Sequence, residues 1–338
     1  MRGLLDEYPY SIRPRQNRKN NLAVIEDYLS RFYGRSALVL ASARTGLYAI
    51  YKFLGLNRSD HILMPDFMCQ AVLNITNTSG FPVKRADEKT KAVLVFHQWG
   101  YPQKMDEVIT EAKKRNLIVI EDCAHSFDSS YKGRKIGTFG KAAIFSFAKL
   151  FPTYLGGVLV SGNAGLIDYV KKDRAQKDKF VNRLFNFIAG RIAKKSFEKG
   201  KARFWLDIIY LKSIHYPNLG RKYLRYLPGD LQSFETELAA RKQNYQFLKS
   251  ALKKELLIPD WDADIDPDPF LIPVFLPEQK LMSCREALLR KGIFTEILHF
   301  DINRNLFAPD YRKSLAIPCH QMMERRGLEK MAEVINQA

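Results

Sequence analysis

Apolar residues along the chain follow two patterns, short continuous runs and longer runs with helical spacing. Short runs rich in β-branched residues predict buried strands, and they are SALVLAS (36–42), AVLVF (92–96), NLIVIED (116–122), AAIFSF (142–147) and VLVS (158–161). Runs with helical spacing predict amphipathic helices, the clearest being 22–33, which is followed by Gly34, and the long pattern over 227–256. Strands that alternate with helices predict an α/β fold with a mostly parallel sheet.

The same patterns divide the chain into three parts. Residues 1–20 are polar and basic and predict a surface arm. Residues 21–230 hold the strand runs and predict a large domain. Residues 231–338 begin with the long helical pattern, cross a proline-rich stretch into a strand, and continue as helix, strand, strand and helix. This last part predicts a linking helix and a small C-terminal α/β domain.

Composition places the chain among globular proteins, because 46% of its 338 residues are hydrophobic. No apolar run approaches the roughly eighteen residues of a membrane-spanning helix, and the first 20 residues lack the apolar core of a signal peptide, so we expect a cytoplasmic protein. The four cysteines are far apart and form no C-x-x-C pair. The sequence therefore predicts neither a disulfide framework nor a metal site.

The formal net charge of +18 is large and unevenly placed. Residues 171–225 hold sixteen Lys and Arg against four Asp and Glu, a net charge of +12, with aromatic and aliphatic residues interleaved. Such a basic amphipathic stretch can lie on an anionic membrane surface or dock an anionic partner. It can also be a solvated helical face at a subunit contact, which is the commoner outcome. Nucleic acid is not favoured, since no binding motif accompanies the charge.

The candidate chemistry is concentrated between residues 120 and 161. Asp122 ends a buried strand, and open α/β sheets bind ligands at such strand tips. The strand run 142–147 predicts a following loop that contains Lys149. The sequence neighbours of Lys149 are apolar, so burial should lower the pKa of its amine, as an imine-forming lysine needs. Pyridoxal phosphate requires such a lysine and a carboxylate that keeps its ring nitrogen protonated. Lys149 and Asp122 are the candidates for these two roles.

A candidate phosphate site precedes them in the chain. Ser42 follows a predicted strand and can cap a helix whose first turn contains Arg44 and Thr45. A helix N-terminus with free amides and an arginine is a ready anion site. Taken alone, such a turn is more often an ordinary capped helix. Together with the pattern of Asp122 and Lys149, phosphate binding is the better explanation.

The ordered motifs E-D-x-A-H, G-T-F-G, F-S-F, lysine and G-G-x-x-V-S resemble the DegT/DnrJ/StrS family of pyridoxal-phosphate-dependent sugar aminotransferases. SFAKLFPTYLGG matches the pattern S-L-R-K-x-L-P-x-x-x-G-G of a divergent branch without a gap. The resemblance covers roughly residues 21–330 and is specific only in the 120–161 core. It implies a fold-type I transferase, with a large domain whose mixed, mostly parallel sheet is sandwiched by helices and a small C-terminal domain.

The resemblance also implies roles for individual residues. Lys149 would carry the cofactor as a Schiff base, and Asp122 would hold the ring nitrogen. The remaining cofactor contacts that it implies are His125 at the ring oxygen, Ser146, Arg44 and Thr45 at the phosphate, and Cys69, with Phe67 nearby, at the stacking position. His97 stands at a strand tip as a further candidate contact, and His299 and His320 as candidates for the edge of the substrate cleft; each is also explained as a packing residue.

Three departures from the family pattern leave alternatives open. The spacing from Ser146 to Lys149 is two residues short of the usual form, Lys141 stands where an aspartate is usual, and the N-x-R-M-x-E-L-Q segment that serves the neighbouring subunit's site is not recognisable. A homodimer is nevertheless implied by the resemblance. No residue can be named that would cross its interface.

The resemblance implies an aminotransferase that acts on a nucleotide-linked keto sugar, with an amino acid as donor, in surface-glycan or amino-sugar biosynthesis. Sugar dehydration on the same scaffold uses histidine in place of the lysine, and Lys149 argues against it. A third hypothesis is a catalytically altered relative whose 171–225 segment binds membrane or a glycan-assembly partner. A nicotinamide-binding protein is not favoured, since no G-x-G-x-x-G follows a strand.

Overall fold

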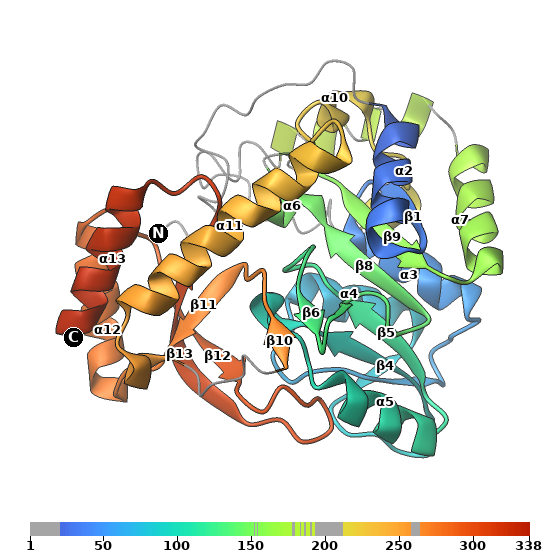
Figure 1. The fold of residues 1–338 in the computed structure, drawn as a ribbon. Helices are drawn as coiled ribbons and strands as arrows, with labels where there is room; N and C mark the ends of the chain where they lie inside the picture. The colour runs from blue at the N-terminus through green and yellow to red at the C-terminus, as the bar shows by residue number, and fades with distance from the viewer. Residues whose placement is uncertain are drawn as a thin grey trace.

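The structure is a computed structural model. It describes residues 21–151, 153, 155–177, 180–182, 184, 185, 187–189, 191, 192, 212–257 and 264–338. The predicted arm at 1–20 and much of the basic stretch 171–225 lie outside the described residues. Figure 1 shows a large part built on a central sheet, and a C-terminal part that packs at one end of the long helix α11.

A seven-stranded sheet in the order β1-β9-β8-β5-β4-β2-β3 forms the centre of the large part. Its strands are β1 (Ser36–Leu40), β2 (His61–Leu63), β3 (Phe81–Val83), β4 (Thr90–Phe96), β5 (Ile118–Asp122), β8 (Ala142–Ser146) and β9 (Gly157–Ser161). The pairs from β3 to β8 are parallel, whereas β9 is antiparallel to both of its neighbours. The sheet is therefore mixed and mostly parallel, as expected.

Helices cover both faces of this sheet, because its strands are apolar on both faces. Successive residues of β4 alternate between two hydrophobic cores, Val93 and Val95 facing one and Ala92 and Leu94 the other. The helices of the large part whose ends lie among the described residues include α2 (Leu22–Tyr33), α3 (Ala43–Phe53), α4 (Gln70–Ser79), α5 (Met105–Lys114), α6 (Phe147–Leu150), α7 (Ala164–Gln176) and α10 (Arg221–Leu224). Helices α2 and α5 pack in the first core, and α3, α4 and α7 in the second. The result is a three-layer α/β/α sandwich.

The C-terminal part has its own antiparallel sheet in the order β11-β13-β12. Its elements are α11 (Leu231–Ala251), β11 (Leu271–Val274), α12 (Glu278–Arg290), β12 (Glu296–Asp301), β13 (Tyr311–Pro318) and α13 (Arg325–Gln337). A further small sheet joins β10 (Ile265–Asp266) to β6 (Ser130–Tyr131) and β7 (Arg134–Lys135) of the large part.

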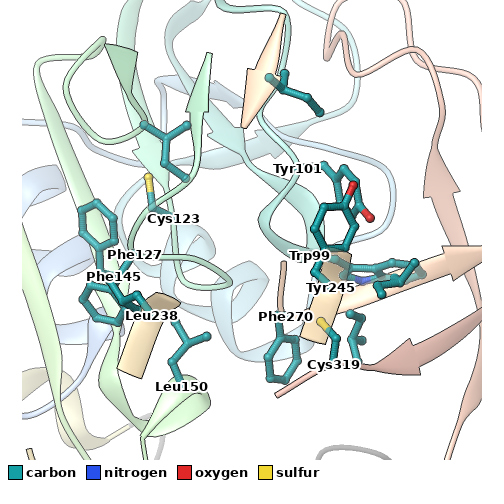
Figure 2. Packing of buried hydrophobic residues seen from close by; sticks show 14 of the residues in the cluster. Trp99, Tyr101, Cys123, Phe127, Phe145, Leu150, Leu238, Tyr245, Phe270 and Cys319 are labelled. Carbon is teal, nitrogen blue, oxygen red and sulfur yellow. The ribbon is translucent and has the colours of Figure 1, made fainter. Parts of the chain in front are cut away.

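Helix α11 connects the two parts through a continuous hydrophobic core. Figure 2 draws Leu238 and Tyr245 of α11 within this core, and α11 contacts α2 of the large part and α13 of the C-terminal part. Both α11 residues are buried. The helix therefore packs against the large part along one half and against the C-terminal part along the other.

The sequence patterns predicted most elements but misjudged the segment around Lys149. Helix α2 ends at Gly34 in the left-handed conformation (φ 62°), as predicted from its glycine stop. The sequence predicts a loop at Lys149, but this residue lies in the single helical turn α6. The turn forms because Phe147 and Leu150, three positions apart, are both fully buried on one side of it.

No helix of the described part of the chain is both long enough and apolar enough to cross a membrane.

Candidate functional site

The candidate site lies at the edge of the sheet where the parallel strands β4, β5 and β8 end. Asp122 is the last residue of β5 and is only 2% exposed. Its Oδ1 accepts a hydrogen bond from the Ala124 N–H at 3.0 Å. Burial raises the pKa of Asp122 above its ordinary value, although the Lys149 amine and the Ala124 N–H oppose this. A buried carboxylate at a strand tip is suited to a cationic partner on a bound ligand.

The Lys149 amine contacts the His125 ring within electrostatic range of this carboxylate. Lys149 Nζ lies 2.5 Å from His125 Nε2, and the Trp99 N–H donates to His125 Nδ1 at 3.1 Å. Because Nδ1 is an acceptor, the proton of the neutral ring is on Nε2, which must donate to Lys149. An ammonium has no lone pair to accept this bond. With this tautomer of His125, the contact is a hydrogen bond when Lys149 is a neutral amine.

Burial shifts the pKa of both side chains in the direction of their neutral forms. Burial lowers the pKa of Lys149, and the nearby Arg44 cation lowers it further, whereas Cys69 and Asp122 raise it. Burial also lowers the pKa of His125 well below its usual value, with a contribution from Lys149. Arg44, Cys69, Asp122 and His125 thus all lie within electrostatic range of Lys149.

The N-terminus of α3 completes this edge of the site. The Ser42 hydroxyl accepts the Thr45 N–H at 3.2 Å and pairs with the Thr45 hydroxyl at 3.0 Å, so the predicted cap is present. A Cβ on Gly157 would lie 2.1 Å from the Ala43 nitrogen, so only glycine permits β9 to pass this close to the helix start. Ser146 is paired with Gly157 and is brought to the same helix N-terminus.

The two residues predicted at the stacking position have different surroundings. Cys69 is the exposed N-cap residue of α4 and lies within electrostatic range of Lys149. Phe67 stacks instead on the ring of His299, with centroids 4.2 Å apart and planes 10° apart, and its edge meets Tyr311. The structure therefore brings Cys69 to the candidate site, whereas Phe67 joins the large part to the C-terminal sheet.

His97 and Glu121 lie beneath the site and serve the fold. The His97 Nδ1 accepts the Gln103 N–H, so its Nε2–H donates to Glu121 at 3.1 Å. Glu121 also accepts the N–H groups of Gly137, Phe139 and Gly140, which orders the G-T-F-G turn. Burial opposes ionisation, but these bonds hold the pKa of Glu121 below its ordinary value.

The sequence does not single out Glu121, because Glu121 and Asp122 are adjacent carboxylates at the same strand end. Their side chains point to opposite faces of the sheet, and only the structure shows which face carries the candidate site. Together with Cys123, His97 and Glu121 form a cluster whose ligand atoms lie within 4.8 Å of one another. The hydrogen bonds above already occupy both histidine nitrogens and both carboxylate oxygens. We therefore interpret the cluster as part of the fold.

These residues fit pyridoxal phosphate in their chemistry. The amine of Lys149 can react with the aldehyde of the cofactor, and the buried carboxylate of Asp122 can pair with its ring nitrogen. The capped N-terminus of α3 can bind its phosphate. The fit rests on Lys149, Asp122 and the turn that follows Ser42.

Residues 82–181 match the DegT/DnrJ/EryC1/StrS aminotransferase family. The chain is 32% identical over 152 residues to GDP-perosamine synthase of Escherichia coli O157:H7, a match that spans 39% of this chain and 42% of that protein. It is 26% identical over 352 residues to UDP-4-amino-4,6-dideoxy-N-acetyl-beta-L-altrosamine transaminase of Campylobacter jejuni, spanning 92% of this chain and 87% of that protein.

The fold is similar to that of solved sugar aminotransferases. With Helicobacter pylori PseC, an aminotransferase involved in the biosynthesis of pseudaminic acid, the TM-score is 0.68 at 17% identity, over 97% of this chain and 93% of that chain. Identity this low establishes the fold alone. The architecture is that of fold-type I transferases.

Proposed function

Since the chain belongs to the DegT/DnrJ/EryC1/StrS aminotransferase family, we propose that it transfers an amino group to the keto carbon of a nucleotide-linked sugar, with pyridoxal phosphate held at Lys149. The observation that carries the proposal is the contact at 2.5 Å between Lys149 Nζ and His125 Nε2, beside the buried Asp122. An amine held neutral in this way is ready to attack an aldehyde.

Each contact of the cofactor has a candidate residue. Asp122 would pair with the protonated ring nitrogen, and Arg44, Thr45 and Ser146 would contact the phosphate at the N-terminus of α3. His125 would contact the ring oxygen through the Nε2–H that faces Lys149, and Cys69 would lie against the ring face. When bound, the cofactor supplies an electron sink for the carbon that exchanges its amino group.

Lys149 would also move the proton that amino transfer requires. Its amine is buried and its pKa is lowered, so the free base is available closer to neutral pH than in an exposed lysine. The Asp122 carboxylate would remain ionised opposite the ring nitrogen, because a cationic partner offsets the cost of its burial.

The substrate class is supported by charge and by the relatives. The net charge of +18 favours an anionic substrate such as a nucleoside diphosphate sugar. The names of two relatives refer to GDP-linked and UDP-linked amino sugars. An amino acid would be the amino donor, and the product would serve amino-sugar or surface-glycan biosynthesis.

The alternative is a catalytically altered relative whose segment 171–225 docks on a membrane or on a partner. Its support is a set of large hydrophobic side chains in this segment that are 42–68% exposed. They are Phe180, Val181, Leu184, Phe187 and Ile188. The same side chains are equally suited to a subunit contact in a homodimer, which is the arrangement that we propose.

The test is amino transfer by the full chain with pyridoxal phosphate, glutamate and a panel of UDP-, GDP- and dTDP-linked keto sugars, read by mass spectrometry of the sugar. We expect a mass gain for at least one sugar and none with Lys149→Ala. Lys141→Ala, which removes an exposed lysine, should retain activity. Equal product with both variants, or none from the wild type with any sugar, would contradict the proposal.

A further inference from the structure

The backbone carbonyl directly after Lys149 is held by side chains from distant parts of the chain. Arg241 of α11 donates from Nη2 to the Leu150 oxygen at 3.2 Å. Gln321, in the segment after β13, donates from Nε2 to the same oxygen at 2.9 Å. Two side chains that lie 91 and 171 positions away in sequence therefore meet at one carbonyl of the lysine-bearing turn.

The same two side chains are also bonded to each other. The Arg241 Nη2 donates to the Gln321 Oε1 at 2.6 Å. Arg241 forms an ion pair with Asp268 at 3.5 Å, and the side chains of both are 0% exposed. Burial raises the pKa of Asp268, whereas Arg241 opposes the shift. Gln321 thus uses its oxygen on Arg241 and its nitrogen on Leu150.

Buried ion pairs are weak evidence for stability, since apolar residues of similar volume often stabilise a fold as well or better. Stability alone therefore does not explain why Arg241 and Asp268 are buried as a charged pair, and the position of Arg241 offers another explanation. Helix α6 is a single turn of four residues, which is too short to define its own position in water. A carbonyl clamped from two sides fixes where the turn lies, and with it the direction of the Lys149 side chain.

We propose that Arg241 and Gln321 are positioning residues, which hold the Leu150 carbonyl so that the Lys149 amine stays at His125 Nε2. The importance of Lys149 rests on the proposed function, but the contact itself does not. We call the contacts of Arg241 and Gln321 with the Leu150 carbonyl the clamp. Because Gln321 follows the C-terminal sheet and Arg241 lies on the linking helix, the clamp also joins the C-terminal part to the turn that carries Lys149.

The chain offers a matched control for this clamp. Asn244, also on α11, donates from Nδ2 to the His320 carbonyl at 2.7 Å. It holds the segment that carries Gln321 without touching Leu150. Asn244→Ala therefore removes a bond between the same two elements and leaves the clamp in place.

The test measures how readily Lys149 reacts as the pH is varied. The full chain, freed of any bound cofactor by dialysis against hydroxylamine, is methylated with formaldehyde and cyanoborohydride, and labelling of Lys149 is read by peptide mass spectrometry. Lys141, which is exposed, serves as the internal reference. The midpoint of the labelling profile reports the protonation of the Lys149 amine, and no cofactor is involved.

Gln321→Ala should move the midpoint for Lys149 up by about 0.7 pH unit, the equivalent of one net hydrogen bond, because the amine leaves its buried contact with His125. Gln321→Glu keeps an oxygen for Arg241 but lacks the donor to Leu150, so it should shift the midpoint in the same direction. Asn244→Ala should leave the midpoint unchanged.

Midpoints for Gln321→Ala and Gln321→Glu that coincide with the wild type would overturn the proposal. An equal shift in Asn244→Ala would also overturn it, because general loosening would then explain the result. Absence of amino transfer in the assay above would overturn the proposed function. The labelling of Lys149 would still test the positioning role of Arg241 and Gln321, so the two proposals can fail separately.

Discussion

At the scale of single residues, the protonation states around Lys149 follow from which atoms donate and which accept. The Trp99 N–H fixes the tautomer of His125, and with this tautomer the contact of His125 with Lys149 is a hydrogen bond when the lysine is neutral. The nearby Asp122 raises the pKa of Lys149 electrostatically, and the nearby Arg44 lowers it. The sequence could place Asp122 at a strand end and Lys149 shortly after another strand, since both are local features. Their roles toward a cofactor stay a prediction. The Trp99 contact could not, because nothing local marks a backbone N–H as the partner of a distant ring.

The state of His125 gives a prediction about stability and pH. Because burial holds its pKa well below the ordinary value, the folded chain leaves this ring neutral while the unfolded chain protonates it below about pH 6.5. Stability from this group is therefore present above that pH and is lost as the pH falls. Between about pH 7 and pH 5 the loss should be up to roughly 2 kcal/mol.

His125→Gln removes the titrating ring. Between about pH 7 and pH 5, the unfolding free energy of this variant should therefore fall by up to roughly 2 kcal/mol less than that of the wild type. The measurement is urea unfolding of both proteins at the two pH values. Parallel declines in the wild type and in the variant would show that His125 is protonated in the folded chain.

At the scale of elements, strand tips and one helix N-terminus define the site. The strands could be predicted because each is a continuous apolar run that is buried on both faces of the sheet. The turn α6 was predicted as a loop, because four residues carry too little periodicity to identify a helix. The approach of Gly157 to Ala43 joins strands and helix that are far apart in sequence, and no local signal indicates it.

The cap of α3 gives a prediction at this scale. Ser42→Ala should destabilise the fold by about 1 kcal/mol and should weaken binding of pyridoxal phosphate, because the first turn of α3 is the proposed phosphate site. Asn163 caps α7 in the same way, through a bond from the Leu166 N–H, and it serves as the control.

Asn163→Ala should lower the unfolding free energy by about 1 kcal/mol, as Ser42→Ala does. It should leave the dissociation constant of pyridoxal phosphate unchanged. Urea unfolding and fluorescence titration supply the two quantities for each variant. If both variants weakened binding equally, or if neither did, the start of α3 would not be the phosphate site.

At the scale of the whole molecule, helix α11 and the clamp at Leu150 join the C-terminal part to the sheet that carries the lysine. The two-part organisation could be predicted from the change of pattern after the long helix. The contacts of Arg241 and Gln321 could not, since buried polar pairs between distant segments have no periodic signature. The domain boundaries themselves stay a prediction.

Association of the chain gives a prediction at the same scale. Leu184 and Ile188 are 48% and 47% exposed and four residues apart. If they lie at a subunit contact, Leu184→Glu with Ile188→Glu should convert a dimer to a monomer in sedimentation equilibrium, because a buried contact does not accept unpaired carboxylates. The control is Met282→Glu with Leu289→Glu, which changes two exposed side chains of α12.

A dimer that survives the first pair of substitutions would exclude this contact. Loss of flotation with vesicles of anionic phospholipid in that variant, with the dimer intact, would favour the surface-docking alternative instead.

The proposed activity depends on a covalent bond between Lys149 and pyridoxal phosphate. Its most direct test is the absorption spectrum of the purified chain with added pyridoxal phosphate, followed by borohydride reduction and peptide mapping. We predict a visible band that borohydride removes, and one stable label on Lys149. No band, or a label spread over exposed lysines such as Lys141, would show that Lys149 does not hold the cofactor.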